Sequence, residues 1–264
     1  MTEIWWLLPL VMALLCGVVS ALTGTLLLVQ RRLFQANLIS HAVLPGLALA
    51  VAMGIDPGLG GALSGLAGAL LAERLSGGER GKGNGDDAVL NTVLAGFLGL
   101  GVLLIPLLGI RVDLEAVLFG DLLAASIADL VRTVLALAGV LALLVWRYRE
   151  LVFLGVDPLG AASAGLPVRA MRLLVTLVTA FTVVSAMTAV GVVLVIALMG
   201  GPALLALGGA TSLRQALLRA ASIGMGLAGA GFVLAIQPAI NLPPGPLIGV
   251  LSMFLLPFSS LGRR

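Results

Sequence analysis

The only histidine of the chain lies in an apolar stretch, together with an asparagine and a proline at helical spacing. Asn37, His41 and Pro45 follow one another at intervals of four residues, so on an α-helix they lie one above another on the same face. Because proline has no N–H group, the carbonyl oxygen of His41 loses its usual helical hydrogen bond. This face therefore offers an amide oxygen, an imidazole nitrogen and a backbone carbonyl oxygen, which are donors suited to a metal ion in transit.

Each polar residue of this face also has a structural interpretation. Ionisable residues inside membrane helices usually mark a route or a site, which favours an ion pathway for His41. For Asn37, a hydrogen bond between membrane helices is an alternative that the sequence leaves open. Cys16, the one cysteine, lies in another apolar run and is expected to be a packing residue, which excludes a disulfide framework and a cysteine-based zinc site.

The composition predicts an all-α integral membrane protein that forms a single domain over residues 1–264. The 264 residues are 60% hydrophobic and 10% charged, and the mean hydropathy is +1.19, values that exclude a soluble domain of this size. Thirty-five glycines predict helices that pack closely through small residues. The net charge of +3 reflects membrane orientation, and it gives no reason to expect a nucleic-acid partner.

The apolar runs predict eight or nine transmembrane helices, and nine is the preferred number. The chain from Leu173 to Ser212 carries no charge and is about twice the length of one span, so a turn is expected near residues 188–191. The nine predicted spans lie near residues 5–29, 33–53, 57–73, 88–109, 130–146, 171–187, 190–207, 215–236 and 243–259.

The distribution of charge predicts an outer amino terminus and a cytoplasmic carboxyl terminus. With that orientation, thirteen of the fifteen basic residues face the cytoplasm and only Arg111 and Arg132 lie outside. The outer segments then carry a surplus of carboxylates, which would attract cations or a basic partner, although each of them could equally be a solvated loop residue. These are Glu3, Asp56, Asp113, Glu115, Asp121 and Asp129.

Two predicted cytoplasmic loops interrupt the apolar pattern. Residues 76–87 are rich in glycine and charge, which indicates a flexible linker, and their Gly-Lys pair lacks the spacing of a phosphate-binding loop. The chain is therefore not expected to hydrolyse ATP by itself. Residues 147–172 are long enough for a short amphipathic helix between turns at Asp157-Pro158 and at Gly165-Leu166-Pro167.

A third feature is Gly200-Gly201-Pro202 in the seventh predicted span. Pro202 frees the carbonyl of Leu198, and the two glycines allow the helix to bend. Broken helices that line a cavity are common in transporters, so this segment is predicted to be a hinge or gate.

Five segments in order along the chain resemble the membrane permeases of bacterial ABC importers for manganese, zinc or iron. The first contains the block Ser-His-Ala-Val-Leu-Pro-Gly at residues 40–46, and the resemblance covers nearly the whole chain. The segments are LLLVQRRLFQANLISHAVLPGLALA, AVLFGDLLAAS, VDPLGAASAGLPV, AVGVVLVIALMGGPALLA and INLPPGPLIGVL.

The resemblance implies a permease like those of type II ABC importers, working as a homodimer in the bacterial inner membrane. Separate cytoplasmic ATPases would drive transport, and an extracytoplasmic binding protein would deliver the ion. No permanently bound cofactor is expected, since the metal ion is the cargo. The ATPase would seat on a coupling loop at residues 150–170, through Asp157, Pro158, Ala161, Ser163, Gly165 and Leu166.

The chain departs from the family at the metal site. The family carries an aspartate and a histidine four residues apart on the second helix; His41 matches the histidine, but Asn37 stands in place of the aspartate. Loss of this carboxylate should weaken the hold on a divalent ion. The missing charge could come from Asp121 in the outer loop, or a second His41 could come from the symmetry-related chain.

An oxygen-rich ligand set with one imidazole favours manganese, with ferrous iron next, over zinc, which prefers several nitrogen or sulfur ligands. A carrier or channel without an ATPase is the main rival within transport. An intramembrane enzyme such as a metalloprotease would need a His-Glu-x-x-His pair or an aspartate dyad within the spans, and the sequence has neither.

Overall fold

A computed structural model describes residues 6–75, 84–110, 120–237 and 242–257, and these residues form helices and no β-strand. The described residues form nine longer helices, with a single-turn helix and a six-residue helix between them. They are α1 (Leu7–Val29), α2 (Leu33–Met53), α3 (Pro57–Leu75), α4 (Asn84–Leu107), η1 (Leu122–Ala124), α6 (Ile127–Val156), α7 (Pro158–Ser163), α8 (Val168–Val190), α9 (Val192–Leu207), α10 (Leu213–Ala235) and α11 (Pro244–Leu255).

Each of the nine predicted spans coincides with one of the long helices, which confirms the all-α prediction. Six helices, namely α1, α2, α4, α6, α8 and α10, are long and apolar enough to cross a membrane by length and composition. The helices α9 and α11 are also apolar but have only 16 and 12 residues. At about 1.5 Å per residue, helices of this length are shorter than the hydrocarbon core of a bilayer, which is about 30 Å thick.

The predicted turn in the uncharged stretch falls at Gly191, the one residue between α8 and α9. Gly191 has φ +81°, a left-handed conformation that favours glycine, and its N–H donates to the carbonyl of Met187 at 2.9 Å. The backbone of Gly120, also at positive φ, packs directly against Val190 and Gly191. The break between α8 and α9 therefore depends on two glycines that meet backbone to backbone.

Two predicted boundaries are wrong because hydropathy records only the apolar part of a helix. The helix α4 begins at Asn84, so the predicted linker over residues 76–87 ends earlier; residues 76–83 lie outside the described residues. The helix α6 continues to Val156 instead of ending near residue 146, with a kink at Arg147. Beyond the kink, Leu151 and Leu154 are buried, so packing against the bundle holds the extension in place.

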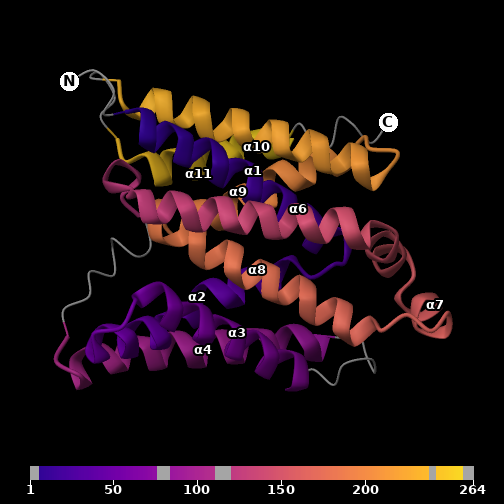
Figure 1. Ribbon diagram of the computed structural model, residues 1–264, viewed down its shortest axis with the longest axis horizontal. Helices are drawn as coiled ribbons and strands as arrows, with labels where there is room; N and C mark the ends of the chain where they lie inside the picture. The colour runs from indigo at the N-terminus through magenta and orange to yellow at the C-terminus, as the bar shows by residue number, and fades with distance from the viewer. Residues whose placement is uncertain (1–5, 76–83, 111–119, 238–241, 258–264) are drawn as a thin grey trace.

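The helices form two groups that α8 joins. Figure 1 shows α2, α3 and α4 together on one side, α1, α9, α10 and α11 on the other, and α8 between them with α6 alongside. Glycines allow the closest approaches within each group: a Cβ at Gly46 of α2 would overlap the carbonyl of Gly60 in α3, and one at Gly17 of α1 would overlap that of Gly224 in α10. Small residues thus set the helix spacing, as expected from the composition.

Candidate functional site

The predicted polar face of α2 lies on a continuous helix. Asn37 and His41 are both half-buried, and the helix continues through Pro45 to Met53. The Nδ1 atom of His41 is buried and has no hydrogen-bond partner among the described residues. Buried polar atoms normally find a partner, so an unpaired imidazole nitrogen at this depth is an open position for a ligand or a water molecule.

The proline of this face is packed against α4. At Gly101 of α4, a Cβ would overlap the side chain of Leu44 and would lie 3.0 Å from the nitrogen of Pro45. Glycine at this position lets the α4 backbone approach the proline-containing turn of α2 closely. The helix that carries His41 is therefore held along this side by α4, and by α3 at Gly46.

No additional acidic or sulfur ligand gathers around a metal position within the part of the chain that the structure describes. No group of three or more His, Cys, Asp and Glu side chains is close enough together there to hold a metal ion. Asp121, the candidate for the missing charge, is exposed, and its Oδ1 accepts hydrogen bonds from the N–H groups of Leu123 and Ala124 at 3.1 and 3.2 Å. That carboxylate caps the single-turn helix η1.

The predicted outer carboxylates are engaged in structural contacts where the structure describes them. Asp56, in the turn between α2 and α3, pairs with Arg132 of α6 at 2.5 Å. Arg132 also lies 3.7 Å from Asp129, which forms a capping box with Ser126 at the start of α6. This ion pair between the α2–α3 turn and α6 was not predicted from the sequence. Glu3, Asp113 and Glu115 lie outside the described residues.

The segment from Gly200 to Pro202 lies within α9, which the structure shows as one helix. A Cβ at Gly201 would overlap the hydroxyl of Ser252 in α11, whose Oγ donates to the carbonyl of Ala197 at 3.1 Å. By contrast, the nearest atom to a Cβ at Gly200 is Leu33 Cδ2 at 3.9 Å. Gly201 thus has a packing role against α11, whereas Gly200 has none.

The predicted short helix of the 150–170 loop is present as α7. Asp157 caps its amino end by accepting a hydrogen bond from the Gly160 N–H at 2.9 Å. At its carboxyl end, Gly165 adopts φ +80° and the Leu166 N–H donates to the carbonyl of Ala161 at 3.1 Å. Ala161 is fully buried and anchors the helix to the bundle. The turn residues that the sequence singled out are therefore those that start and stop α7.

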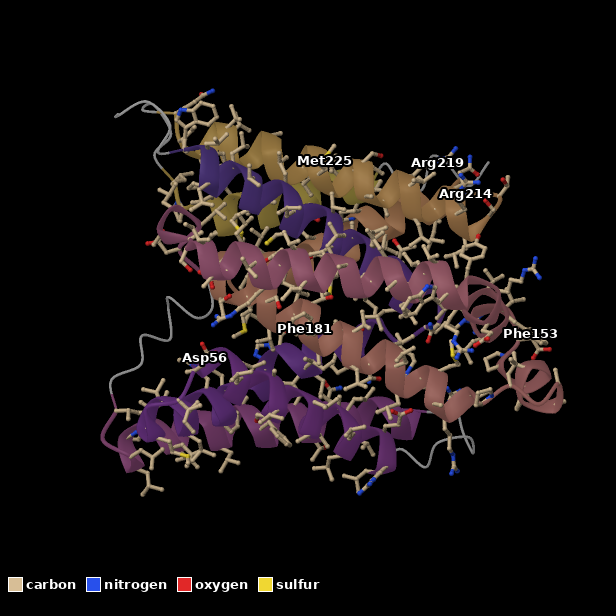
Figure 2. The ribbon with its side chains drawn as sticks, viewed as in Figure 1. Asp56, Phe153, Phe181, Arg214, Arg219 and Met225 are labelled. Carbon is tan, nitrogen blue, oxygen red and sulfur yellow. The ribbon has the colours of Figure 1, made fainter. Side chains whose placement is uncertain are left out.

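The opposite face of α7 and the end of α6 expose apolar side chains. Val156 is 79% exposed and Leu159 is 74% exposed. Figure 2 shows Phe153 at the same end of the structure as Arg214 and Arg219, where basic residues also predict the cytoplasmic side. Exposed apolar side chains at an arginine-rich end of the structure mark a candidate contact surface.

A series of hydroxyl residues along α8 is a second polar feature, which the sequence analysis did not predict although its spacing is regular. Hydroxyl residues recur at every third position of this helix, and several of them contact other helices. Thr23 of α1 donates to Thr182 at 3.4 Å, and Gln35 of α2 donates to Thr176 at 2.9 Å. The hydroxyl series connects α8 to its neighbours inside the bundle. It consists of Thr176, Thr179, Thr182, Ser185 and Thr188.

Comparisons with known proteins agree with this arrangement. The manganese import system permease protein ScaB of Streptococcus gordonii is 31% identical over 253 residues, 94% of this chain and 88% of that protein. The chelated iron transport system membrane protein YfeD of Yersinia pestis is 30% identical over 197 residues, 75% of this chain and 65% of that protein.

A solved structure supports the same relationship. The structure of PsaBC from Streptococcus pneumoniae in complex with Fab superimposes with a TM-score of 0.84 and 28% sequence identity, over 98% of this chain and 91% of that chain. The family model described as "ABC 3 transport family" matches residues 6–262. The family match and the long apolar helices show that the chain is a multi-pass membrane protein of the ABC 3 transport family.

Proposed function

We propose that the chain is the permease subunit of an ATP-driven importer of divalent metal ions, and that manganese is its cargo. The observation that carries the proposal is the buried, unpaired Nδ1 of His41 on a membrane helix in a member of this transport family. An imidazole nitrogen without a partner can take a place in the ion's coordination shell. Asn37, one turn away on the same face, supplies an amide oxygen.

Manganese is favoured by the ligand chemistry and by the relatives. One imidazole with oxygen donors suits manganese or ferrous iron better than zinc. The relatives named above are a manganese permease and an iron transport protein, so ferrous iron is the second candidate. Because no cluster of acidic ligands surrounds His41 in the described residues, we infer that the ion is held weakly and passes through.

The pathway is proposed to form between two copies of the chain. One chain has a single histidine, and its described residues contain no group of three or more His, Cys, Asp and Glu side chains that could hold a metal ion. A second His41 across a two-fold axis would double the number of imidazole donors. The outer end would receive the ion from an extracytoplasmic binding protein. The amino terminus is placed outside and the carboxyl terminus in the cytoplasm of a bacterial inner membrane, by the distribution of basic residues.

The cytoplasmic ATPase is proposed to dock on α7. Its exposed Leu159 and the neighbouring Val156 would enter an apolar groove of the partner, while the Asp157 cap and the buried Ala161 keep the helix rigid. A rigid, anchored helix transmits a displacement to α6 and α8, which it connects. This arrangement links ATP hydrolysis by the partner to movement of the helix bundle.

The test is metal accumulation in cells that depend on this permease, with its ATPase either intact or unable to hydrolyse ATP. We expect manganese to accumulate with the intact ATPase and to fall to background with the inactive one. Equal manganese accumulation in both strains would instead support a carrier or channel. Accumulation of zinc or iron without manganese would reject the assigned cargo.

A further inference from the structure

Buried polar atoms without partners gather where the α1–α2 turn meets the adjacent ends of α3 and α8. Arg32, in that turn, has a buried Nη1 with no hydrogen-bond partner, and Gln35 has an unpaired buried Oε1. Gln30 adds both polar atoms of its amide group. Most of the unpaired buried side-chain atoms in the described residues are found in these three side chains, so this region requires an explanation beyond packing.

The same region has an excess of positive charge. Arg32 Nη2 pairs with Glu73 of α3 at 3.2 Å, and the side chain of Arg32 is only 21% exposed. Arg172 of α8 is half-buried and makes no ion pair with any described residue. Burial is the main cause that lowers the pKa of Arg32; the charge of Glu73 opposes this shift, and that of Arg172 adds to it. Two arginines therefore share one carboxylate in a partly desolvated place.

Packing between α2 and α8 holds these groups together. Gln35 is 4% exposed and Thr176 is fully buried, and Gln35 Nε2 donates to Thr176 Oγ1 at 2.9 Å. Arg172 lies one turn before Thr176 on the same face of α8, and Arg32 lies just before Gln35. A threonine hydroxyl can accept from or donate to an amide, so the unpaired end of Gln35 can equally present its N–H₂ group.

We propose that Arg32, Gln35 and Arg172 form a binding site for a phosphate-class oxyanion. Planar guanidinium groups bind phosphate oxygens through paired, charge-assisted hydrogen bonds, and the Nη1 atom of Arg32 is unpaired. A bound anion would neutralise the excess positive charge of the two arginines. It would also accept a hydrogen bond from the N–H₂ group of Gln35 when the amide presents that group. The source of the oxyanion is either inorganic phosphate from the cytoplasm or the headgroup of an anionic phospholipid, and the site is independent of the metal-binding face of α2.

The first arm of the test measures the thermal unfolding midpoint of the purified permease as inorganic phosphate is added, with chloride keeping the ionic strength constant. The wild type is expected to show a saturable rise. In Arg172→Gln, the phosphate concentration at half-saturation should rise by at least about tenfold, because a charge-assisted hydrogen bond is lost. Arg169→Gln, an exposed arginine three residues earlier on α8, is the matched control and should respond like the wild type.

The second arm compares nanodiscs of phosphatidylglycerol with nanodiscs of phosphatidylcholine, without free phosphate. Stabilisation by phosphatidylglycerol that Arg172→Gln loses and Arg169→Gln keeps would assign the site to a lipid headgroup. Stabilisation in the phosphate arm alone would assign it to the free ion. The proposal is wrong if neither anion stabilises the wild type, or if both arginine variants lose the response equally. If Arg172→Gln does not fold, Arg172→Lys, which keeps the charge but lacks the planar fork, must show the weaker response.

Discussion

At the scale of single residues, the most informative atom is Nδ1 of His41, which is buried and unpaired in the described structure. A histidine that served only for packing would be expected to direct both nitrogens to hydrogen-bond partners. The neighbouring Asn37 departs from the aspartate that the family resemblance leads one to expect. An amide can coordinate a cation but contributes no charge, so this chain should release its ion more readily than a carboxylate-bearing relative.

The effect of this missing charge is open to direct measurement. Asn37→Asp should lower the manganese concentration for half-maximal uptake by about tenfold, because a carboxylate adds Coulombic attraction of about 1–2 kcal/mol near a partly buried ion. The maximal rate should fall as release slows. Gln237→Glu makes the same amide-to-carboxylate change in the exposed turn after α10 and serves as the control. Identical uptake curves for Asn37→Asp and wild type would argue that Asn37 does not contact the ion.

At the scale of the elements, the helices were predictable because the lengths of the apolar runs and the positions of glycines determine where helices begin and end. The positions of the nine long helices and the break at Gly191 followed from hydropathy, from the absence of charge and from a turn-forming residue. The extension of α6 was missed because its burial depends on contacts of Leu151 and Leu154 that have no local sequence signal. Prediction thus succeeded where the cause was local.

Contacts between distant helices were not predictable from one sequence. The Asp56–Arg132 pair joins residues 76 positions apart, and the Gln35–Thr176 hydrogen bond joins residues 141 positions apart. Composition and periodicity indicate which faces are polar, but they do not say which polar faces meet. For the same reason the α2 face was recognised as a candidate site, whereas the arginine-rich region beside it was not.

The two glycines of α9 separate a packing role from a hinge role. Gly201→Ala should lower thermal stability, since its Cβ would overlap Ser252, whereas Gly200→Ala should leave stability nearly unchanged. If α9 bends during transport, Gly200→Ala should still slow manganese uptake, because alanine stiffens the helix. Thermal unfolding and uptake are measured on both variants.

Gly226→Ala, at an open position of α10, controls for the general effect of replacing a helical glycine. Uptake by Gly200→Ala at the rate of this control would show that α9 works as a rigid helix.

At the scale of the whole molecule, two helix groups are joined by α8 and by polar contacts near both ends (Figure 1). Asp56–Arg132 connects the α2–α4 group to α6 at the end opposite α7, and Gln35 of α2 contacts Thr176 of α8 towards the α7 end. A partly exposed ion pair such as Asp56–Arg132 stabilises by about 1 kcal/mol or less, so it can break and re-form as the groups shift. Such marginal contacts suit a protein whose halves must move to pass an ion.

Docking of the ATPase at α7 has a clear prediction. Leu159→Asp should abolish copurification of the ATPase and ATP-driven uptake, because it places a charge at the centre of the proposed apolar contact. Thr211→Asp is the control, since it adds the same charge in the exposed turn before α10. It removes the hydrogen bond that Thr211 Oγ1 donates to Gln215 Oε1, but the Thr211 N–H still donates to the same oxygen at 2.8 Å. Retention of the ATPase by the Leu159 variant at wild-type level would exclude α7 as the docking element.

The central claim is that manganese enters along the His41 face of α2, and manganese accumulation by His41→Ala tests it most directly. Ser40→Ala is the matched control, because Ser40 is the adjacent residue and its hydroxyl only donates to the carbonyl of Ala36 at 2.8 Å. At equal membrane expression, we expect His41→Ala to reduce manganese accumulation about tenfold or more, as loss of a coordinating nitrogen would, while Ser40→Ala accumulates manganese like the wild type. Wild-type accumulation by His41→Ala would contradict the account.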